Sequence, residues 1–237
     1  MTKDEQKDFF NENGYLIIPG YLPPERIERL LIEVENIFSH EGVLSGWEQP
    51  ANAPFVRRLS NLFSKGDVFV DLATEPIILE YAEMVIGNLF SWHGMNLHDP
   101  LPGYSLVRQA IHADRENFKN CTAYFNVLCS LDDITSENGA TRIVPKSHKR
   151  AWPKELLEDL FAPVKNEVLA ICPAGSLVFI HGDVWHGARM NNSLKSRRVI
   201  HIGYANPETP TQYPIANTLP EAVHQRIAKL SNKLVLR

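Results

Sequence analysis

The feature that most constrains the fold of this chain is a series of short apolar segments that follows residue 88. The strand candidates are LFSWHGMNL, SLVRQAIHA, TAYFNVLCSL, TRIVP, GSLVFIH and RRVIHIGYA. Turn-forming residues separate them, and Asn138-Gly139 is a strong turn signal between two of them. Many short strands joined by turns are typical of a β-sandwich or a small barrel. The sequence therefore predicts a mainly β core over about 89–206.

Helices are predicted to flank this core. Residues 2–12 are predicted to form a short helix that Thr2 caps, and residues 23–39 carry an apolar stripe at helical spacing. A further helix is predicted at about 75–87, and the tail from about 219 has a helical pattern. The predicted class is thus mainly β with flanking helices.

The chain is predicted to form a single domain over 1–237, because no repeat or linker divides it. Its predicted parts are a helical N-terminal part over 1–88, the β core and a C-terminal tail.

A long loop is predicted at about 42–60, and loops of this length in a compact domain are often functional lids. Trp47 could cover an apolar part of a substrate, and Arg57 or Arg58 could meet a carboxylate or a phosphate. A surface loop with solvated arginines is the alternative.

Composition excludes several classes of partner. The formal net charge is −4 and the isoelectric point is near 6.1, so the chain has no basic field for nucleic acid. No apolar run is long enough to span a bilayer, and the first residues, MTKDEQKDFF, are charged rather than signal-like. The three cysteines show no CxxC spacing. A cytoplasmic protein that binds neither nucleic acid nor membrane is predicted.

Two motifs supply the ligands of a metal ion. His112 and Asp114 form His-x-Asp in QAIHADREN, and His186 follows in VFIHGDVWHG. Two imidazoles and one carboxylate are the donor set of the facial triad, which holds Fe(II) and leaves positions open for chemistry. Alternate residues of a strand point to the same face, so His112 and Asp114 could converge on one ion. The sequence predicts that these three residues hold Fe(II).

An arginine pair follows the distal histidine. Arg197 stands eleven residues after His186. Arginine binds a carboxylate through two parallel charge-assisted hydrogen bonds, as a dicarboxylate co-substrate requires. Arg198 is the alternative, because only the register of the strand decides which side chain points inward. The pattern indicates a non-haem iron oxygenase that uses 2-oxoglutarate.

Other residues compete for these roles. His181-Gly182-Asp183 is a second His-x-Asp close to His186, but its glycine predicts a turn after a strand that ends at His181. His148 is a further alternative ligand.

Several polar residues near the predicted site have two interpretations each. Tyr124 and Asn126 lie on a strand candidate that should flank the metal, where either could contact the co-substrate or simply pack in the core. His93, His98 and His201 are interpreted as ordinary core or surface residues.

Several segments, in order, resemble the phytanoyl-CoA dioxygenase-like oxygenases. NENGYLIIPGYLPPE is similar to the opening of that family, and QAIHAD to its proximal iron motif. LDDITSENGATRIVPKSHK is similar to the segment that ends in Pro-Gly-Ser-His, with Lys146 in place of the glycine. PAGSLVFIHGDVWHGARMNNSLKSRR is similar to the distal segment, with His186 and Arg197 at the matching positions. The resemblance covers most of the chain, but no motif can be placed in residues 40–90.

This resemblance implies a double-stranded β-helix, the cupin-like jelly roll, as the core. It favours Arg197 over Arg198 and implies Fe(II), 2-oxoglutarate and O2. The implied reaction is hydroxylation of a small organic substrate with release of succinate and CO2. Two other classes stay open at this point: a cupin-type metalloenzyme that is not an oxygenase, such as an isomerase, and a non-catalytic jelly-roll binding protein. The substrate and the oligomeric state are not predicted.

Overall fold

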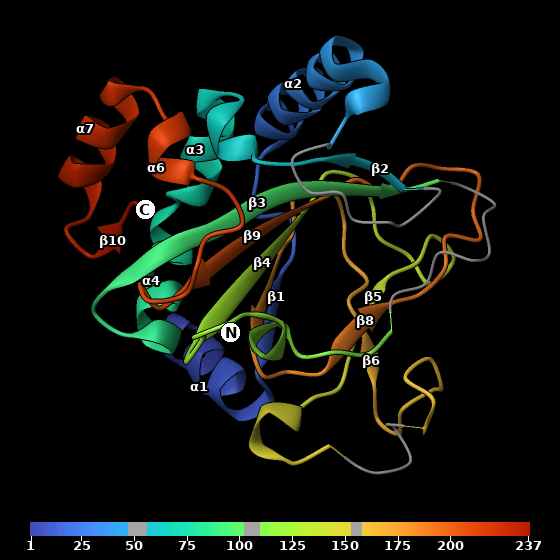
Figure 1. The fold of residues 1–237 in the computed structure, drawn as a ribbon. Helices are drawn as coiled ribbons and strands as arrows, with labels where there is room; N and C mark the ends of the chain where they lie inside the picture. Colours follow the sequence, from blue (N-terminus) through green and yellow to red (C-terminus); the bar gives the residue numbers. More distant parts are fainter. Residues whose placement is uncertain (47–55, 102–109, 153–157) are drawn as a thin grey trace.

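The computed structural model describes residues 1–46, 56–101, 110–152 and 158–237 (Figure 1). Its core is a jelly roll made of a seven-stranded sheet and a three-stranded sheet. The strands of the large sheet are β1 (Tyr15–Ile18), β2 (Val56–Leu59), β3 (Phe90–Pro100), β4 (Tyr124–Ser130), β7 (Leu177–His181), β9 (Val199–Ala205) and β10 (Leu234–Val235). The strands of the small sheet are β5 (Thr141–Ile143), β6 (Val168–Leu169) and β8 (His186–Ala188).

The large sheet is ordered β1-β7-β4-β9-β3-β10, and β2 pairs with β3 as well. The small sheet is ordered β6-β5-β8. Strands that are neighbours in space are mostly distant in sequence, as the long crossovers of a jelly roll require. The fold predicted from the sequence and from the family resemblance is therefore confirmed.

Helices cover one side of the large sheet, and the small sheet lies on the other side (Figure 1). The α-helices are α1 (Lys3–Asn13), α2 (Pro24–Glu41), α3 (Asp67–Ala73), α4 (Pro76–Ile86), α6 (Ile215–Thr218) and α7 (Glu221–Leu230). Short 3₁₀ helices are η1 (Gly42–Leu44), η2 (Leu62–Ser64), η3 (Asp114–Asn117) and η4 (Ser147–Lys149). None of the helices in the described ranges is long and apolar enough to cross a membrane.

The two faces of the large sheet bury different kinds of residue. On β9, Ile200 and Ile202 belong to the main apolar core under the helices. His201 and Gly203, which alternate with them, line a cavity on the opposite face. This alternation separates a structural face from a face that is available for chemistry.

Capping residues and a buried apolar stripe explain the helices that were predicted from the sequence. The hydroxyl of Thr2 accepts from the backbone N–H of Glu5, whose carboxylate accepts from the N–H of Thr2. Helix α1 ends at Gly14, whose φ of 77° is left-handed. In α2 the predicted stripe is buried at Leu30 and Val34. Helices α4 and α7 also match their predicted ranges.

Two segments differ from the sequence prediction. Val56–Leu59, predicted as part of a loop, forms strand β2 and pairs antiparallel with β3. Helix α3 was not predicted at all.

The expectation that His112 and Asp114 share one strand face is also wrong. His112 forms an isolated bridge with His186, and Asp114 begins the 3₁₀ helix η3. Much of the expected strand SLVRQAIHA falls in 102–109, outside the described residues.

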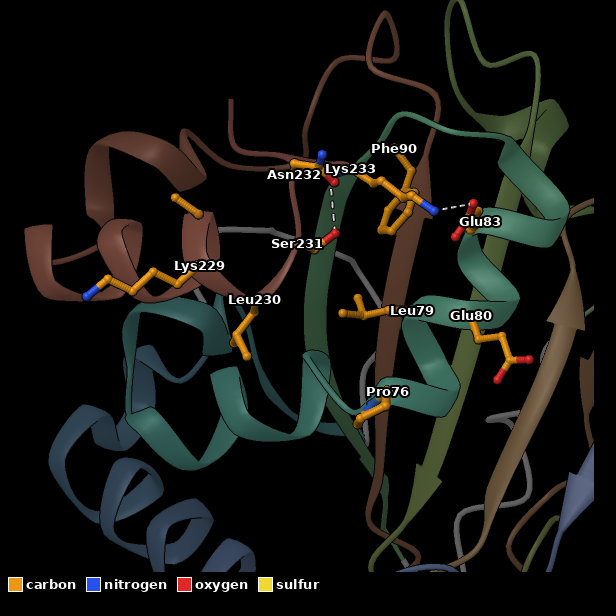
Figure 2. Close-up of a pocket in the computed structure, with 11 residues that line it drawn as sticks. Pro76, Leu79, Glu80, Glu83, Phe90, Lys229, Leu230, Ser231, Asn232 and Lys233 are labelled. Carbon is orange, nitrogen blue, oxygen red and sulfur yellow. Dashed lines mark hydrogen bonds and ion pairs between the residues drawn. The ribbon is translucent and has the colours of Figure 1, made fainter.

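The C-terminal segment closes the helical side of the molecule. A groove of about 510 Å³ lies between α4 and the turn that joins α7 to β10 (Figure 2). Leu79 and Leu230 line it, and the Nζ of Lys233 lies 2.5 Å from a carboxylate oxygen of Glu83. The groove is separate from the polar cavity on the opposite face of the large sheet, because the two share no lining residue.

Candidate metal centre

Three side chains that could hold a metal ion meet inside the jelly roll. One ligand atom from each of His112, Asp114 and His186 lies within 4.8 Å of the other two. The Nε2 of His112 lies 3.3 Å from one carboxylate oxygen of Asp114, and the Nε2 of His186 lies 3.6 Å from the other. Within the described ranges, no other group of three such residues converges in this way. We refer to these residues as the triad.

Backbone hydrogen bonds hold the two imidazoles side by side. His112 and His186 each donate their N–H to the carbonyl oxygen of the other at 2.9 Å. The Nδ1 of His112 lies 3.0 Å from the carbonyl oxygen of Ala110, and the Nδ1 of His186 lies 2.9 Å from that of Val184. A carbonyl oxygen only accepts, so the proton of each ring sits on Nδ1. Each Nε2 therefore faces the carboxylate of Asp114 and is the ring nitrogen that a metal ion would take.

The carboxylate of Asp114 is buried and oriented by β4. The Nδ2 of Asn126 donates to its Oδ2 at 2.8 Å. Burial alone raises the pKa of Asp114, but the imidazoles of His186 and His112 and the amide of Asn126 together lower it. Asp114 is thus an ionised ligand at neutral pH.

The two imidazoles have different electrostatic surroundings. Burial lowers the pKa of His186, and the nearby carboxylate of Asp114 only partly opposes this. For His112, burial also acts to lower the pKa, but the hydrogen bond and charge of Asp114 outweigh it and the net shift is upward.

Arg198 points away from the cavity. Its Nη2 lies 2.7 Å from Oδ1 of Asp132, and its Nη1 lies 3.1 Å from a carboxylate oxygen of Glu35 on α2. These ion pairs place Arg198 on the side of the sheet that the helices cover. Arg198 therefore has a structural role.

Arg197 continues the alternation of His201 and Gly203 and so faces the inside of the jelly roll. It is buried, and its Nε has no hydrogen-bond partner among the residues that the structure describes. Burial lowers the pKa of Arg197 to about 10, although Asp99 acts to raise it. The residue stays cationic at neutral pH and keeps an unused donor, as a carboxylate-binding arginine would.

A cavity of about 110 Å³ extends from the triad along the inner face of the large sheet. Its other described lining residues are mostly polar: Arg58, Gly94, Asn96, His98, Phe118, Tyr124, Asn126, His201, Gly203 and Gln212. Tyr124 and Asn126 thus lie where the sequence predicts them, beside the triad.

His98 and His201 line this cavity, although their sequence context indicates only ordinary core or surface residues. Their rings lie 4.5 Å apart, and burial, followed by the charge of Arg197, lowers the pKa of His201 to about 3. A signal was present in LFSWHGMNLHDP: the small or polar Gly94, Asn96 and His98 alternate with the apolar Met95 and Leu97.

The competing metal ligands do not converge on the triad. His181 ends β7 as predicted, and its Nδ1 lies 3.8 Å from Oδ2 of Asp183. Asp183 pairs with Arg115 at 2.5 Å. The Nε2 of His148 lies 3.2 Å from the backbone oxygen of Asn11.

The three residues proposed for substrate contact have different positions. Trp47 lies outside the described residues. Arg57 pairs with Glu35 at 3.0 Å and with the buried Asp99 at 3.3 Å, so it joins α2, β2 and β3. Arg58 lines the cavity.

The residues present fit the implied metal and co-substrate. Two imidazoles whose Nε2 atoms face one ionised carboxylate match the ligands that non-haem Fe(II) takes, with open positions left. The buried, unused Nε of Arg197 matches a carboxylate at the far end of a co-substrate. A jelly roll with this donor set defines the class of Fe(II)- and 2-oxoglutarate-dependent oxygenases.

Comparison with known proteins identifies the family within this class. Residues 10–199 match the family model described as phytanoyl-CoA dioxygenase (PhyH), so the chain belongs to that family. A probable phytanoyl-CoA dioxygenase of Caenorhabditis elegans is 24% identical over 98% of this chain and 85% of its own length. An Fe(II)/2-oxoglutarate-dependent dioxygenase of Aspergillus novofumigatus, nvfF, is 26% identical over 95% of this chain and 79% of its own.

A solved structure shows the same fold. The non-heme alpha ketoglutarate dependent carbocyclase SnoK from nogalamycin biosynthesis superposes with a TM-score of 0.73 at 20% identity, over 89% of this chain and 88% of that chain. The chain is thus an Fe(II)- and 2-oxoglutarate-dependent dioxygenase.

Proposed function

We propose that this enzyme hydroxylates a small organic molecule: one oxygen atom of O2 enters the substrate and the other enters succinate as 2-oxoglutarate loses CO2. The support is the donor set of the triad together with the polar cavity beside it. Facial-triad iron leaves coordination positions for co-substrate and oxygen. The free cysteines Cys121, Cys129 and Cys172 are buried, which supports our further proposal of a cytoplasmic location.

In this proposal His112, Asp114 and His186 hold the iron. Bound iron with 2-oxoglutarate supplies the activation of O2 that attack on a C–H bond requires. Asn126 orients the carboxylate of Asp114 through its 2.8 Å hydrogen bond. Tyr124 presents its hydroxyl to the same cavity and is proposed, like Asn126, to lie against the co-substrate.

Cationic residues would hold the acidic groups of the ligands. Arg197 is proposed to bind the C5 carboxylate of 2-oxoglutarate, because it is buried on the cavity face with an unused donor. The charge of Arg58, like that of Arg197, acts to lower the pKa of His98 and of His201. Arg58 is proposed to bind an anionic group of a ligand.

The observation that carries the proposal is that the Nε2 atoms of His112 and His186 converge on the ionised carboxylate of Asp114. Asp114→Ala removes the anionic ligand, so Fe(II) affinity should fall by roughly 100-fold or more, since even partners outside the ligand shell commonly contribute 10- to 100-fold. Succinate formation should fall to background. Anaerobic titration calorimetry with Fe(II) and a succinate assay measure the two effects.

His181→Ala is the matched control, because it removes the competing histidine and should leave iron binding intact. Wild-type 2-oxoglutarate turnover by Asp114→Ala would show that the ligand assignment is wrong.

A further inference from the structure

A chain of hydrogen bonds fixes one amide on the wall of the cavity. The hydroxyl of Tyr213 donates to Oδ1 of Asn96 at 2.5 Å, and Nδ2 of Asn96 donates to Oε1 of Gln212 at 2.9 Å. The backbone N–H of Gln212 donates to the carbonyl oxygen of His93 at 2.8 Å. Asn96 and Tyr213 are buried, so the position of the Gln212 side chain is determined by the protein alone.

These contacts use the oxygen of Gln212 and leave its nitrogen for a ligand. The side chain lines the cavity, and its Nε2 donates to no residue within the described part of the chain. A glutamine nitrogen carries two N–H donors and no acceptor. Gln212 therefore presents hydrogen-bond donors, without a charge, to whatever fills the cavity.

The sheet leaves room for this arrangement. A Cβ atom at Gly94 would overlap with Oε1 of Gln212, so only glycine at this position of β3 permits the side chain to lie where it does. Gly94 pairs with Gly203, and Gly203 pairs with Asn126, the residue that contacts Asp114. Gly94, Gly203 and Asn126 are thus cross-strand neighbours on β3, β9 and β4, and Gln212 lies over Gly94. Asn126, at the triad, is two strands away from Gly94, or roughly 10 Å.

The co-substrate end of the cavity lies elsewhere. Arg197 precedes the first residue of β9, whereas Gly203 lies towards the other end of that strand. A co-substrate that joins the triad to Arg197 would extend away from Gln212. The Gln212 side of the triad is therefore the side that a substrate can occupy.

We propose that Gln212, held by Asn96 and Tyr213, is a specificity-determining residue that donates to a neutral oxygen acceptor of the substrate, such as a hydroxyl, ether or carbonyl oxygen. The inference rests on the function proposed above. It defines the substrate as an oxygenated polar compound, because a plain hydrocarbon at this place would leave both amide N–H groups unpaired. A site built to hydrogen-bond a substrate rejects analogues without the acceptor by roughly 10⁴-fold.

The test uses two matched probe sets with the iron-loaded enzyme. One set contains cyclitols, pyranosides and hydroxylated steroids, and the other contains the corresponding deoxygenated hydrocarbons. Substrate is detected as succinate formed above the rate with 2-oxoglutarate alone. Members of the oxygenated set should stimulate succinate formation, and the hydrocarbons should not.

Gln212→Leu keeps the approximate size of the side chain and removes the donors, together with the oxygen that accepts from Asn96. It should raise KM for a stimulating probe by roughly tenfold or more, the cost of an unpaired polar group. The dissociation constant for 2-oxoglutarate should stay within twofold of wild type. Gln225→Leu, on the exposed side of α7, is the control and should change neither.

Each other outcome overturns the inference. Stimulation by the hydrocarbons, by neither set, or equally in wild type and Gln212→Leu would remove the substrate role of Gln212. Weaker binding of 2-oxoglutarate to Gln212→Leu would assign the residue to the co-substrate instead. Failure of the proposed function has a separate sign: the wild type would form no succinate from 2-oxoglutarate under any condition.

Discussion

At the scale of single residues, Arg197 and Arg198 are chemically identical neighbours with opposite surroundings. Arg197→Ala should raise the dissociation constant for 2-oxoglutarate by about thirtyfold or more, because losing one side of a buried charge pair costs about 2–5 kcal/mol. Iron affinity should be unchanged, since Arg197 is not a ligand. Anaerobic titration calorimetry with each ligand in turn measures both constants.

Arg198→Ala is the control for this prediction. It removes the ion pairs with Asp132 and Glu35, so it should lower thermal stability and leave co-substrate affinity intact. If the two variants rank the other way round in 2-oxoglutarate affinity, the carboxylate contact belongs to Arg198.

The residues of the site differ in how far sequence alone reveals them. His112, Asp114 and His186 were predicted because their donor chemistry and motif order are specific. The choice between Arg197 and Arg198 depended on strand register, which the sequence does not state. Gln212 could not be predicted, because its role arises when the segment after β9 folds back over Gly94 of β3.

At the scale of secondary-structure elements, strand β9 passes beneath Tyr124 of β4 at Gly203. A Cβ atom at 203 would overlap with the hydroxyl of Tyr124. Gly203→Ala should therefore destabilise the protein by about 1–3 kcal/mol, the usual cost of overpacking. Urea unfolding of the purified variant measures this loss.

A double-mutant cycle distinguishes this contact from a general effect of the substitution. In a Tyr124→Phe background the hydroxyl is absent, so the same Gly203→Ala change should cost less. Strictly additive costs would mean that Tyr124 is not what makes glycine necessary here.

Elements with a regular apolar pattern were predicted, and elements without one were not. Helices α1 and α2 carry caps and a stripe, and they appear within a few residues of the expected bounds. Strand β2 was missed because Val56–Leu59 contains two adjacent arginines. Arg57 is held by Glu35 and Asp99, whereas Arg58 faces the cavity, so the strand alternates between two polar environments.

At the scale of the whole molecule, neutral histidines that are buried or half-buried make the free energy of unfolding depend on pH. Burial is the main cause that lowers the pKa of His93 and of His181 to about 4, and that of His201 to about 3. Between these values and about 6.5, the unfolded chain takes up protons that the folded protein refuses. Stability should therefore fall as pH falls below about 6.5; His112, with its raised pKa, opposes this only in part.

Thermal melting of the metal-free protein at steps from pH 7.5 to 5.0 measures this dependence. A tenfold difference in proton affinity between the folded and unfolded chain corresponds to about 1.4 kcal/mol, so a loss of a few kcal/mol is expected across the series. His181→Gln should flatten the dependence, and His40→Gln, at an exposed position of α2, should not. A melting temperature that is constant over this range would contradict the assignment of neutral buried imidazoles.

The hydrogen bonds that hold His112 and His186 have a consequence for how the enzyme acquires its metal. Backbone contacts of the protein itself hold the two imidazoles side by side, and none of these contacts is specific for one divalent cation. Sites with nitrogen and oxygen ligands generally bind cobalt, nickel, copper and zinc more tightly than ferrous iron. Correct loading must therefore come from which ions the cell makes available. Protein produced where nickel or zinc is abundant should carry those ions until they are chelated and replaced with iron.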